Sequence, residues 1–248
     1  MRVIREKWQG IQEHIMVFML AFCMVVGGYG IFTAPASKEC SEQASLEREL
    51  ENNVRALQQM DLAGYEPDGS SFQQDSSFGA GALSGKKQKN KYEPVSVIGD
   101  SVFLGAAVSF KKIYKNAVID AKISRQVIQA IDVAKQMKKK GKLRDTVIIA
   151  LGTNGTFTQA TGQKLIDYLG KDRTIYWVSA YGKRLTWQGA VNKTIQRLVR
   201  KNKNVHIISW AKYAKNHPNW FYQDGIHLNS RGQMGFAKFI RDSISSRA

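Results

Sequence analysis

The sequence predicts a three-layer α/β/α sandwich around a five-stranded parallel sheet, preceded by one N-terminal transmembrane helix. Two observations indicate this architecture. From residue 94 onward, short runs rich in Val and Ile alternate with amphipathic stretches, which is typical of βαβ units whose helices cover both faces of a parallel sheet. Near the N-terminus, residues 15–34 form an apolar stretch without a charged side chain.

The N-terminal segment is predicted to be a signal-anchor. Residues 15–34 are 20 uncharged residues, and as a helix they would span about 30 Å, the thickness of a bilayer core. Residues 1–14 include Arg2, Arg5 and Lys7, and basic residues before a span favour a cytoplasmic N-terminus with the rest of the chain exported. We therefore expect a single-pass protein of the cell membrane with its main domain outside.

Cleavage is an alternative for the same segment. Ala34-Pro35-Ala36 resembles an A-x-A signal-peptidase site, and cleavage near Ala36 would release the domain as a secreted protein. The apolar stretch is longer than a typical signal-peptide core, which favours the retained anchor. Cys23 lies inside the stretch and Cys40 just beyond it, so we expect neither a disulfide nor a thiolate metal site in the domain that follows.

Residues 37–91 are predicted to be a stalk helix followed by a flexible linker. Apolar side chains recur at helical spacing within residues 41–62, which indicates either a polar stalk helix or a short parallel coiled coil. Residues 64–91 are rich in Gly, Ser, Gln and Lys and have no periodicity, as in flexible linkers. The main domain then comprises residues 92–248.

The main domain contains five predicted strands and five predicted helices. We expect strands at 95–99, 117–121, 146–151, 174–179 and 204–209. We expect helices at roughly 102–114, 125–140, 159–169, 187–201 and 230–245. In folds of this kind ligands bind beyond the carboxyl ends of the strands, so the loops that follow the strands are the place to look for chemistry.

Three of these loops contain chemically useful side chains. They read Gly99-Asp100-Ser101, Gly152-Thr153-Asn154-Gly155 and Asp224-Gly225-Ile226-His227. Each is weak alone, because the first can be a helix cap, the second a turn, and the third a chance pairing of Asp and His. Together, in this order on one edge of a parallel sheet, they predict a single site.

The residue types of this site fit nucleophilic catalysis by a serine. A serine hydroxyl needs a base to accept its proton, and the base needs a group that orients it. Among the four histidines, His227 alone has a carboxylate three residues upstream, Asp224. The side-chain amide of Asn154 and the backbone N–H of Ser101 are candidate donors to the developing oxyanion. If His227 is the base, activity should fall below about pH 6.5, where an ordinary histidine becomes protonated.

These residues resemble the SGNH (GDSL) hydrolases, whose four sequence blocks are named for Ser, Gly, Asn and His. Ser101 matches the nucleophile, Asn154 the oxyanion asparagine, and Asp224 with His227 the DxxH pair. Ser124 stands where the family has its second-block glycine, which supplies an oxyanion N–H. The resemblance covers about residues 94–246 and implies a flavodoxin-like SGNH fold and a reaction that needs no metal or organic cofactor.

Several longer stretches resemble one subgroup, the extracytoplasmic catalytic domain of Gram-positive peptidoglycan O-acetyltransferases. The stretches are DSVFLGA, DAKISRQ, LGTNG, WFYQDGIHLNSRGQ and the spacing from Trp187 to Asn192. In the common form a multi-pass membrane acyltransferase domain precedes this domain, whereas here a single apolar span precedes it. The resemblance therefore implies either a separate membrane acyltransferase that supplies acetyl groups or an enzyme that removes them.

Four further residues are candidates for substrate binding. Trp220 belongs to an aromatic cluster that could stack on a sugar ring, and Arg125 could meet an anionic substrate. The resemblance adds Asn192 and Gly152. Packing is the alternative for Trp220 and Asn192, and a solvated helix start is the alternative for Arg125.

The charge distribution bears on the partners. Residues 86–248 contain 31 basic and 9 acidic residues, a formal charge of +22, while residues 38–62 are acidic. At a cell surface such a basic domain fits anionic wall polymers. Nucleic acid is excluded as a partner because the domain is predicted to be exported and has no interleaved aromatic and basic motif. A metal site of His217, Asp224 and His227 would leave Ser101 and Asn154 unexplained.

The sequence thus predicts a surface-exposed serine esterase or acyltransferase that acts on acylated cell-wall carbohydrate. Whether water or a sugar hydroxyl accepts the acyl group stays open, because both reactions use the same residues. Two rivals come from other classes. One is a non-catalytic wall-binding module with the same fold, and the other is a scaffold protein that acts through the helix at 41–62.

Overall fold

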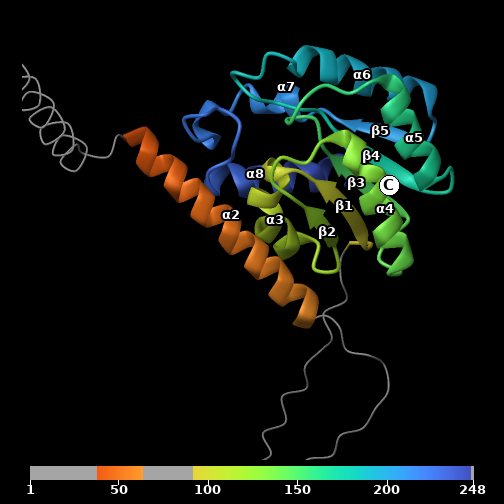
Figure 1. Cartoon of the computed structure of the whole chain (residues 1–248), viewed down its shortest axis with the longest axis horizontal. Coiled ribbons are helices and arrows are strands. Elements are labelled where there is room, and N and C mark those ends of the chain that lie inside the picture. The colour runs from red at the N-terminus through yellow and green to blue at the C-terminus, as the bar shows by residue number, and fades with distance from the viewer. Residues whose placement is uncertain (1–37, 64–91, 247–248) are drawn as a thin grey trace, which may run out of the picture. The chain divides into compact units, whose positions relative to one another are not determined.

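The centre of the domain is a parallel five-stranded sheet with the strand order β2-β1-β3-β4-β5 (Figure 1). A computed structural model describes residues 38–63 and 92–246. The strands are β1 (Val95–Gly99), β2 (Val118–Ala121), β3 (Thr146–Ala150), β4 (Thr174–Val178) and β5 (Val205–Ile208). The chain passes from β1 to one neighbour and then back across to the other. The carboxyl ends of β1 and β3 therefore meet at a topological switch point, where such sheets bind ligands.

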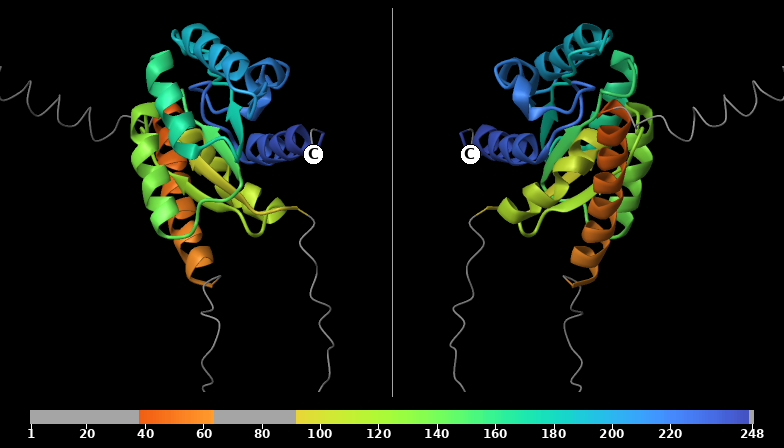
Figure 2. Two further views of the ribbon diagram at one scale, coloured as in Figure 1. Left: turned by 90° about the vertical axis from the view of Figure 1, so that its right-hand side faces the viewer. Right: turned by 90° about the vertical axis from the view of Figure 1, so that its left-hand side faces the viewer.

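Helices cover both faces of the sheet (Figure 2). One layer is formed by α3 (Ser101–Ile113), the short α7 (Trp210–Ala214) and α8 (Ser230–Ser245), and the other by α4 (Ala130–Lys139), α5 (Gln159–Leu169) and α6 (Gln188–Lys201). Each layer has its own apolar core, with Phe103 and Phe236 in the first and Trp177 and Leu165 in the second. Successive side chains of a strand point to opposite faces of the sheet. Because both faces carry apolar side chains and are covered by helices, the whole sheet is buried.

The predicted sandwich is confirmed, with small differences at the element ends. Every predicted strand and helix has its counterpart. The helix expected from residue 125 begins only at Ala130, because Gln126 is extended and its capping box with Gln129 closes a separate 3₁₀ turn, η1 (Val127–Gln129). The helix α7 and the 3₁₀ turn η2 (Pro218–Trp220) were not predicted from the sequence, because they are too short to show helical periodicity.

The acidic segment before the domain forms the predicted helix, α2 (Lys38–Ala63). Of the described residues, those from Ala44 onward belong to one compact unit, and the side chain of Leu50 in α2 is 5% exposed within it. Leu57 also packs against the core of the α3 and α8 layer. Much of the predicted stalk helix is therefore packed on the domain.

The other N-terminal predictions fall on residues that the structure does not describe. The basic segment 1–14, the apolar span 15–34 and the linker 64–91 lie outside the described residues. Within 38–63 and 92–246, no helix has the length and apolar character needed to cross a bilayer.

Candidate active site

Ser101 is the first residue of α3, immediately after β1. Asp100 is the N-cap, and its Oδ1 accepts the Val102 N–H at 3.0 Å. The turn from strand to helix needs Gly99, because a Cβ there would lie 2.7 Å from Phe103 Cβ. Ser101 is 6% exposed, and its N–H belongs to the first turn of a helix, where backbone donors have no partner within the helix. The turn can therefore hold both the helix cap, Asp100, and the predicted nucleophile, Ser101.

Ser101, His227 and Asp224 lie in one hydrogen-bonded line. His227 Nε2 is 3.0 Å from Ser101 Oγ. On the other side of the ring, His227 Nδ1 is 2.5 Å from Asp224 Oδ2. A carboxylate can only accept a hydrogen bond, so the imidazole proton on that side belongs to Nδ1 and Nε2 faces the serine hydroxyl as an acceptor. The structure brings together the three residues that the sequence proposed as a triad.

The carboxylate of Asp224 is held by several donors. Its Oδ1 accepts the N–H of Ile226 at 2.8 Å and of His227 at 3.0 Å. Burial alone would raise the pKa of the Asp224 carboxyl, but the hydrogen bonds from the His227 ring and from the two backbone N–H groups together lower it. Asp224 is therefore ionised at neutral pH and can orient His227.

The loop that contains Asp224 and His227 is a tight turn with its own backbone bonds. Tyr222 N–H donates to the His227 carbonyl at 2.9 Å, and Phe221 forms an isolated bridge with Leu228. Gly225 sits inside the turn at a φ of +68°, where a glycine is favoured. This turn holds Asp224 and His227, which are three residues apart in sequence, next to each other in space.

Two loops hold the predicted oxyanion donors Asn154 and Ser124. Asn154 Nδ2 lies 3.4 Å from both the Arg125 carbonyl and Thr153 Oγ1, distances at which a hydrogen bond is weak. Among the described residues other than glycine, Ser124 alone has a positive φ, +59°. That left-handed conformation is the one glycine adopts most easily, so Ser124 has the backbone that the family's second-block glycine would take.

Asp100 and Thr153 form a link that the sequence analysis missed. Thr153 Oγ1 donates to Asp100 Oδ2 at 2.6 Å, which joins the loop after β3 to the start of α3. Asp100 is 2% exposed, and burial raises the pKa of its carboxyl although hydrogen bonds from Thr153 and Val102 oppose the shift. The signal available in the sequence was the capping position of Asp100, which does not reveal a partner in another loop.

Arg125 does not fit the predicted contact with an anionic substrate. The residue is 7% exposed. Its guanidinium donates to the carbonyl oxygens of Gly99 and Asp120 and to the Asp120 carboxylate at 2.6 Å. Arg125 therefore braces the loop after β2 against the end of β1, and its donors are used inside the protein.

Asn192 and Gly152 also have structural positions. The Asn192 side chain accepts the Ala180 N–H at 2.8 Å and donates to the Ala180 carbonyl at 2.9 Å, which fixes the loop after β4. Gly152 has a φ of +137°, and a Cβ there would lie 2.7 Å from Val191 Cγ1. Both residues therefore shape loops of the site, and no substrate contact is needed to explain them.

Trp220 packs against the domain, which corresponds to the packing alternative. Its ring stacks on His217 at a centroid distance of 3.9 Å. A Cβ on Gly235 of α8 would lie 2.3 Å from the ring. His217, which the alternative metal site requires as a third ligand beside Asp224 and His227, is the residue that stacks on Trp220. In the described part of the chain, no three His, Cys, Asp or Glu side chains gather as metal ligands would.

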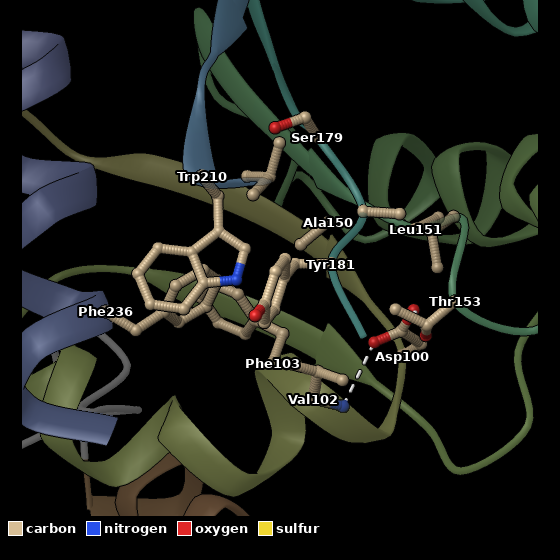
Figure 3. A pocket seen from close by; sticks show the side chains of 12 residues that line it. Asp100, Val102, Phe103, Ala150, Leu151, Thr153, Ser179, Tyr181, Trp210 and Phe236 are labelled. Atoms are coloured by element: carbon tan, nitrogen blue, oxygen red, sulfur yellow. Dashed lines mark hydrogen bonds between the residues drawn. The ribbon is translucent and has the colours of Figure 1, made fainter. Parts of the chain in front are cut away.

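A small pocket is lined by residues from the ends of β3 and β4 and from the start of α3 (Figure 3). Both chain neighbours of Ser101 line it, Asp100 and Val102. Figure 3 shows the rings of Trp210 and Tyr181 on one side of the pocket and Asp100 with Thr153 on the other. The lining is mostly apolar with a few polar groups, as in small-molecule sites generally.

Known proteins are similar to this chain in sequence and in fold. The chain is 37% identical over 164 residues to the O-acetyltransferase OatA of Staphylococcus aureus, across 66% of this chain and 27% of that protein. The C-terminal catalytic domain of Streptococcus pneumoniae peptidoglycan O-acetyltransferase A has a TM-score of 0.56 at 24% identity, covering 62% of this chain and 93% of that domain. A member of the lipolytic G-D-S-L family from Veillonella parvula has a TM-score of 0.51 at 14% identity, covering 62% and 99%.

The described residues thus form an α/β domain with a five-stranded parallel sheet and with Ser101, His227 and Asp224 in one hydrogen-bonded line. No family model matches the chain. In sequence the chain is similar to part of an O-acetyltransferase, and in fold it is similar to the catalytic domain of a peptidoglycan O-acetyltransferase and to a G-D-S-L protein. The chain spans about a quarter of the length of its S. aureus relative.

Proposed function

We propose that this protein is a serine O-acetyltransferase or O-acetylesterase that acts on cell-wall carbohydrate through an acyl-serine intermediate. The observation that supports it most is the hydrogen-bonded line from Ser101 through His227 to Asp224. A non-catalytic wall-binding module needs no such line. The relatives named O-acetyltransferase support the choice of an acetyl ester within the chemistry open to the family.

In the first half of the reaction, His227 Nε2 takes the proton of the Ser101 hydroxyl while Oγ attacks the acyl carbonyl carbon. Asp224 keeps the imidazole in the productive tautomer and stabilises the imidazolium that forms. The protonated ring then gives its proton to the leaving alcohol as the carbon–oxygen bond of the ester breaks. The product of this half-reaction is acyl-Ser101 with His227 neutral again.

The negative charge on the carbonyl oxygen needs donors while the intermediate is tetrahedral. The Ser101 N–H at the start of α3, the Asn154 side-chain amide and the Ser124 N–H are the proposed donors. Their loops follow β1, β3 and β2, which are neighbours in the sheet. The weak contacts of Asn154 in the free protein suit a group that gains its strongest hydrogen bond in the intermediate.

In the second half, His227 removes a proton from the acceptor, which attacks the acyl carbon of acyl-Ser101. The bond from that carbon to Ser101 Oγ then breaks, and the protonated His227 returns the proton to Oγ, which restores the free enzyme. A sugar hydroxyl as acceptor makes the protein a transferase, and water makes it an esterase. The pocket lined by Asp100 and Val102, the chain neighbours of Ser101, is the proposed place for the acyl group. The resemblance to peptidoglycan O-acetyltransferases supports a cell-wall carbohydrate as acceptor or ester, and a membrane acyltransferase as the source of acetyl groups.

The location follows the same proposal. The uncharged segment 15–34 and the basic residues before it support an anchor in the cell membrane with the domain outside. The formal charge of +22 over residues 86–248 would hold the domain near anionic wall polymers. The first statement rests on the sequence alone, because residues 1–37 lie outside the described residues.

A product analysis tests the proposed function. The full chain in detergent and its Ser101→Ala variant are given a small aryl acetate, with and without N-acetylglucosamine oligomers. Acetate release and acetylated oligomer are followed separately, the latter by mass spectrometry. Acetylated oligomer from the wild type alone identifies a transferase, and acetate release alone identifies an esterase. Equal turnover by the two proteins would overturn the proposal.

A further inference from the structure

One carboxylate of α2 reaches the loop of the catalytic histidine. Glu49 Oε2 accepts the Tyr222 hydroxyl at 2.6 Å, and Glu49 Oε1 accepts the side-chain N–H of Gln233 at 2.5 Å. Gln233, in α8, is 7% exposed and also donates to the Leu228 carbonyl at 3.0 Å. Tyr222 precedes Asp224 by two residues, and Leu228 directly follows His227. Glu49 therefore connects to both ends of the loop that positions the proposed base.

The same helix also contacts the element that begins with Ser101. Asn53 Nδ2 donates to the carbonyl oxygens of Leu104 at 3.2 Å and Gly105 at 2.8 Å, both in the first turns of α3. Leu50 lies between Glu49 and Asn53 in sequence and is 5% exposed. A Cβ on Gly105 would be only 3.8 Å from Leu50 Cδ2, so α2 and α3 pack closely side by side (Figure 1).

We propose that Glu49 and Asn53 of α2 are positioning residues for the reaction, and that the catalytic unit includes this helix. Glu49 acts on His227 through Tyr222 and Gln233, and Asn53 acts on Ser101 through α3. This inference rests on the proposed function for its kinetic part, but the contacts concern loop order whatever the reaction. A misplacement of about 1 Å at a catalytic group can lower a rate about 100-fold. The contacts of Glu49 and Asn53, which we call the clamp, hold the elements on both sides of the Ser101–His227 hydrogen bond and therefore matter for catalysis.

Charge adds to the geometry of this clamp. Hydrogen bonds to an ionised acceptor are about twice as strong as those between neutral groups. Glu49 is half-buried, and Tyr222 and Gln233 present their donors to its two oxygens separately. Replacing the carboxylate by an amide leaves one acceptor oxygen in place of two, whereas replacement by alanine leaves none. The two substitutions therefore predict graded effects.

The kinetic test compares variants of the full chain with an aryl acetate as substrate. We expect Glu49→Ala to lower kcat about 10- to 100-fold with little change in KM, and Glu49→Gln to lower it less. Tyr222→Phe should lower kcat in the same direction, and adding it to Glu49→Ala should cause little further loss, because the two residues share one interaction. Glu51→Ala is the matched control, since Glu51 is an exposed glutamate on the same helix.

A second readout separates positioning from overall stability and from the proposed reaction. Amide hydrogen exchange of residues 222–228 is measured in each variant and in Ser101→Ala, at a temperature where every chain is folded. Glu49→Ala should speed exchange in this loop, while exchange in the central strands stays as in wild type. If the wild type does not turn over the ester, the proposed function fails. The exchange result still tests whether Glu49 orders residues 222–228, because it does not depend on the reaction.

The contrary results are equally specific. Glu49→Ala and Tyr222→Phe with wild-type kcat and wild-type exchange at residues 222–228 would overturn the inference. It would also fail if kcat fell only in proportion to the fraction of unfolded protein. Should Glu49→Ala not fold, Glu49→Gln and Tyr222→Phe make the same comparison, because each keeps most of the packing.

Discussion

At the scale of single residues, Ser101 both starts a helix and faces an imidazole. The strand–turn–helix around it depends on Gly99, where a side chain would collide with Phe103, and on the Asp100 cap. The sequence analysis could predict the triad because the GDS turn, the DxxH spacing and the parallel order of strands place these groups at one edge. It could not assign Arg125, because whether a guanidinium points inward depends on the packing of the loop around it.

Arg125 supports a prediction about stability. Its buried guanidinium satisfies two carbonyl oxygens and the Asp120 carboxylate, and hydrogen bonds to charged groups contribute about 1.5–3 kcal/mol each. We expect Arg125→Met to lower the free energy of unfolding by at least one such amount, about 1.5–3 kcal/mol. Urea denaturation measures the loss, with Arg184→Met, an exposed arginine, as control. Equal midpoints for the two variants would show that the brace adds nothing.

Asp100 supports a prediction about pH. Burial raises the pKa of this carboxyl above the unfolded value near 3.8. Its contribution to stability is therefore fully present below pH 3.8 and is lost as the pH rises through the folded-state pKa. Asp100→Asn cannot ionise, so its stability relative to wild type should improve between pH 4 and pH 7. Chemical denaturation at both pH values measures the difference, and a difference independent of pH would contradict the raised pKa.

At the scale of elements, the loops that follow the strands determine where the proposed oxyanion donors Asn154 and Ser124 lie. Ser124 stands where the resemblance predicted a glycine, and its backbone has a left-handed φ of +59°. The sequence shows the serine but not its conformation, because the loop is held by contacts of Arg125 with Gly99 and Asp120 that depend on the folded structure. The loop after β3 similarly depends on Gly152, which has a φ of +137° and no room for a side chain.

Gly152 therefore gives a prediction with a matched control. Alanine at this position must adopt an unfavourable φ and displace Val191, so Gly152→Ala should destabilise the protein by about 1–3 kcal/mol and lower kcat by disturbing Asn154. Gly189 lies in α6 with open space around it. Gly189→Ala should leave stability unchanged or raise it by up to about 1 kcal/mol. Thermal unfolding and ester turnover of both variants check the pair, and a neutral Gly152→Ala would refute the strain argument.

At the scale of the whole molecule, the alternating pattern of strands and helices was sufficient to predict the sandwich. Periodicity identifies an element and its apolar side, but it does not identify the surface that this side meets. For that reason the leucines of α2 suggested a stalk or a coiled coil, while the structure packs Leu50 and Leu57 against the domain. The polar contacts of Glu49 are still less accessible from sequence, because their partners lie more than 170 residues away.

The charge of the molecule leads to a prediction about binding. With 31 basic and 9 acidic residues over positions 86–248, we expect the protein to bind a polyanion such as long-chain polyphosphate. Affinity should fall steeply as salt rises from about 50 mM to 500 mM, because salt screens exposed charges. Fluorescence anisotropy of labelled polymer measures it. Affinity that does not change with salt would contradict a role for the net charge.

The central claim is that Ser101 takes up an acyl group with the help of His227 and Asp224. The most direct measurement is peptide mass spectrometry of the full chain, quenched in acid after brief exposure to an aryl acetate. We expect acetyl on the peptide that contains Ser101, much less of it in His227→Ala, and none at that position in Ser101→Ala. Acetylation of other residues without Ser101, in a protein that still turns over the ester, would contradict the account.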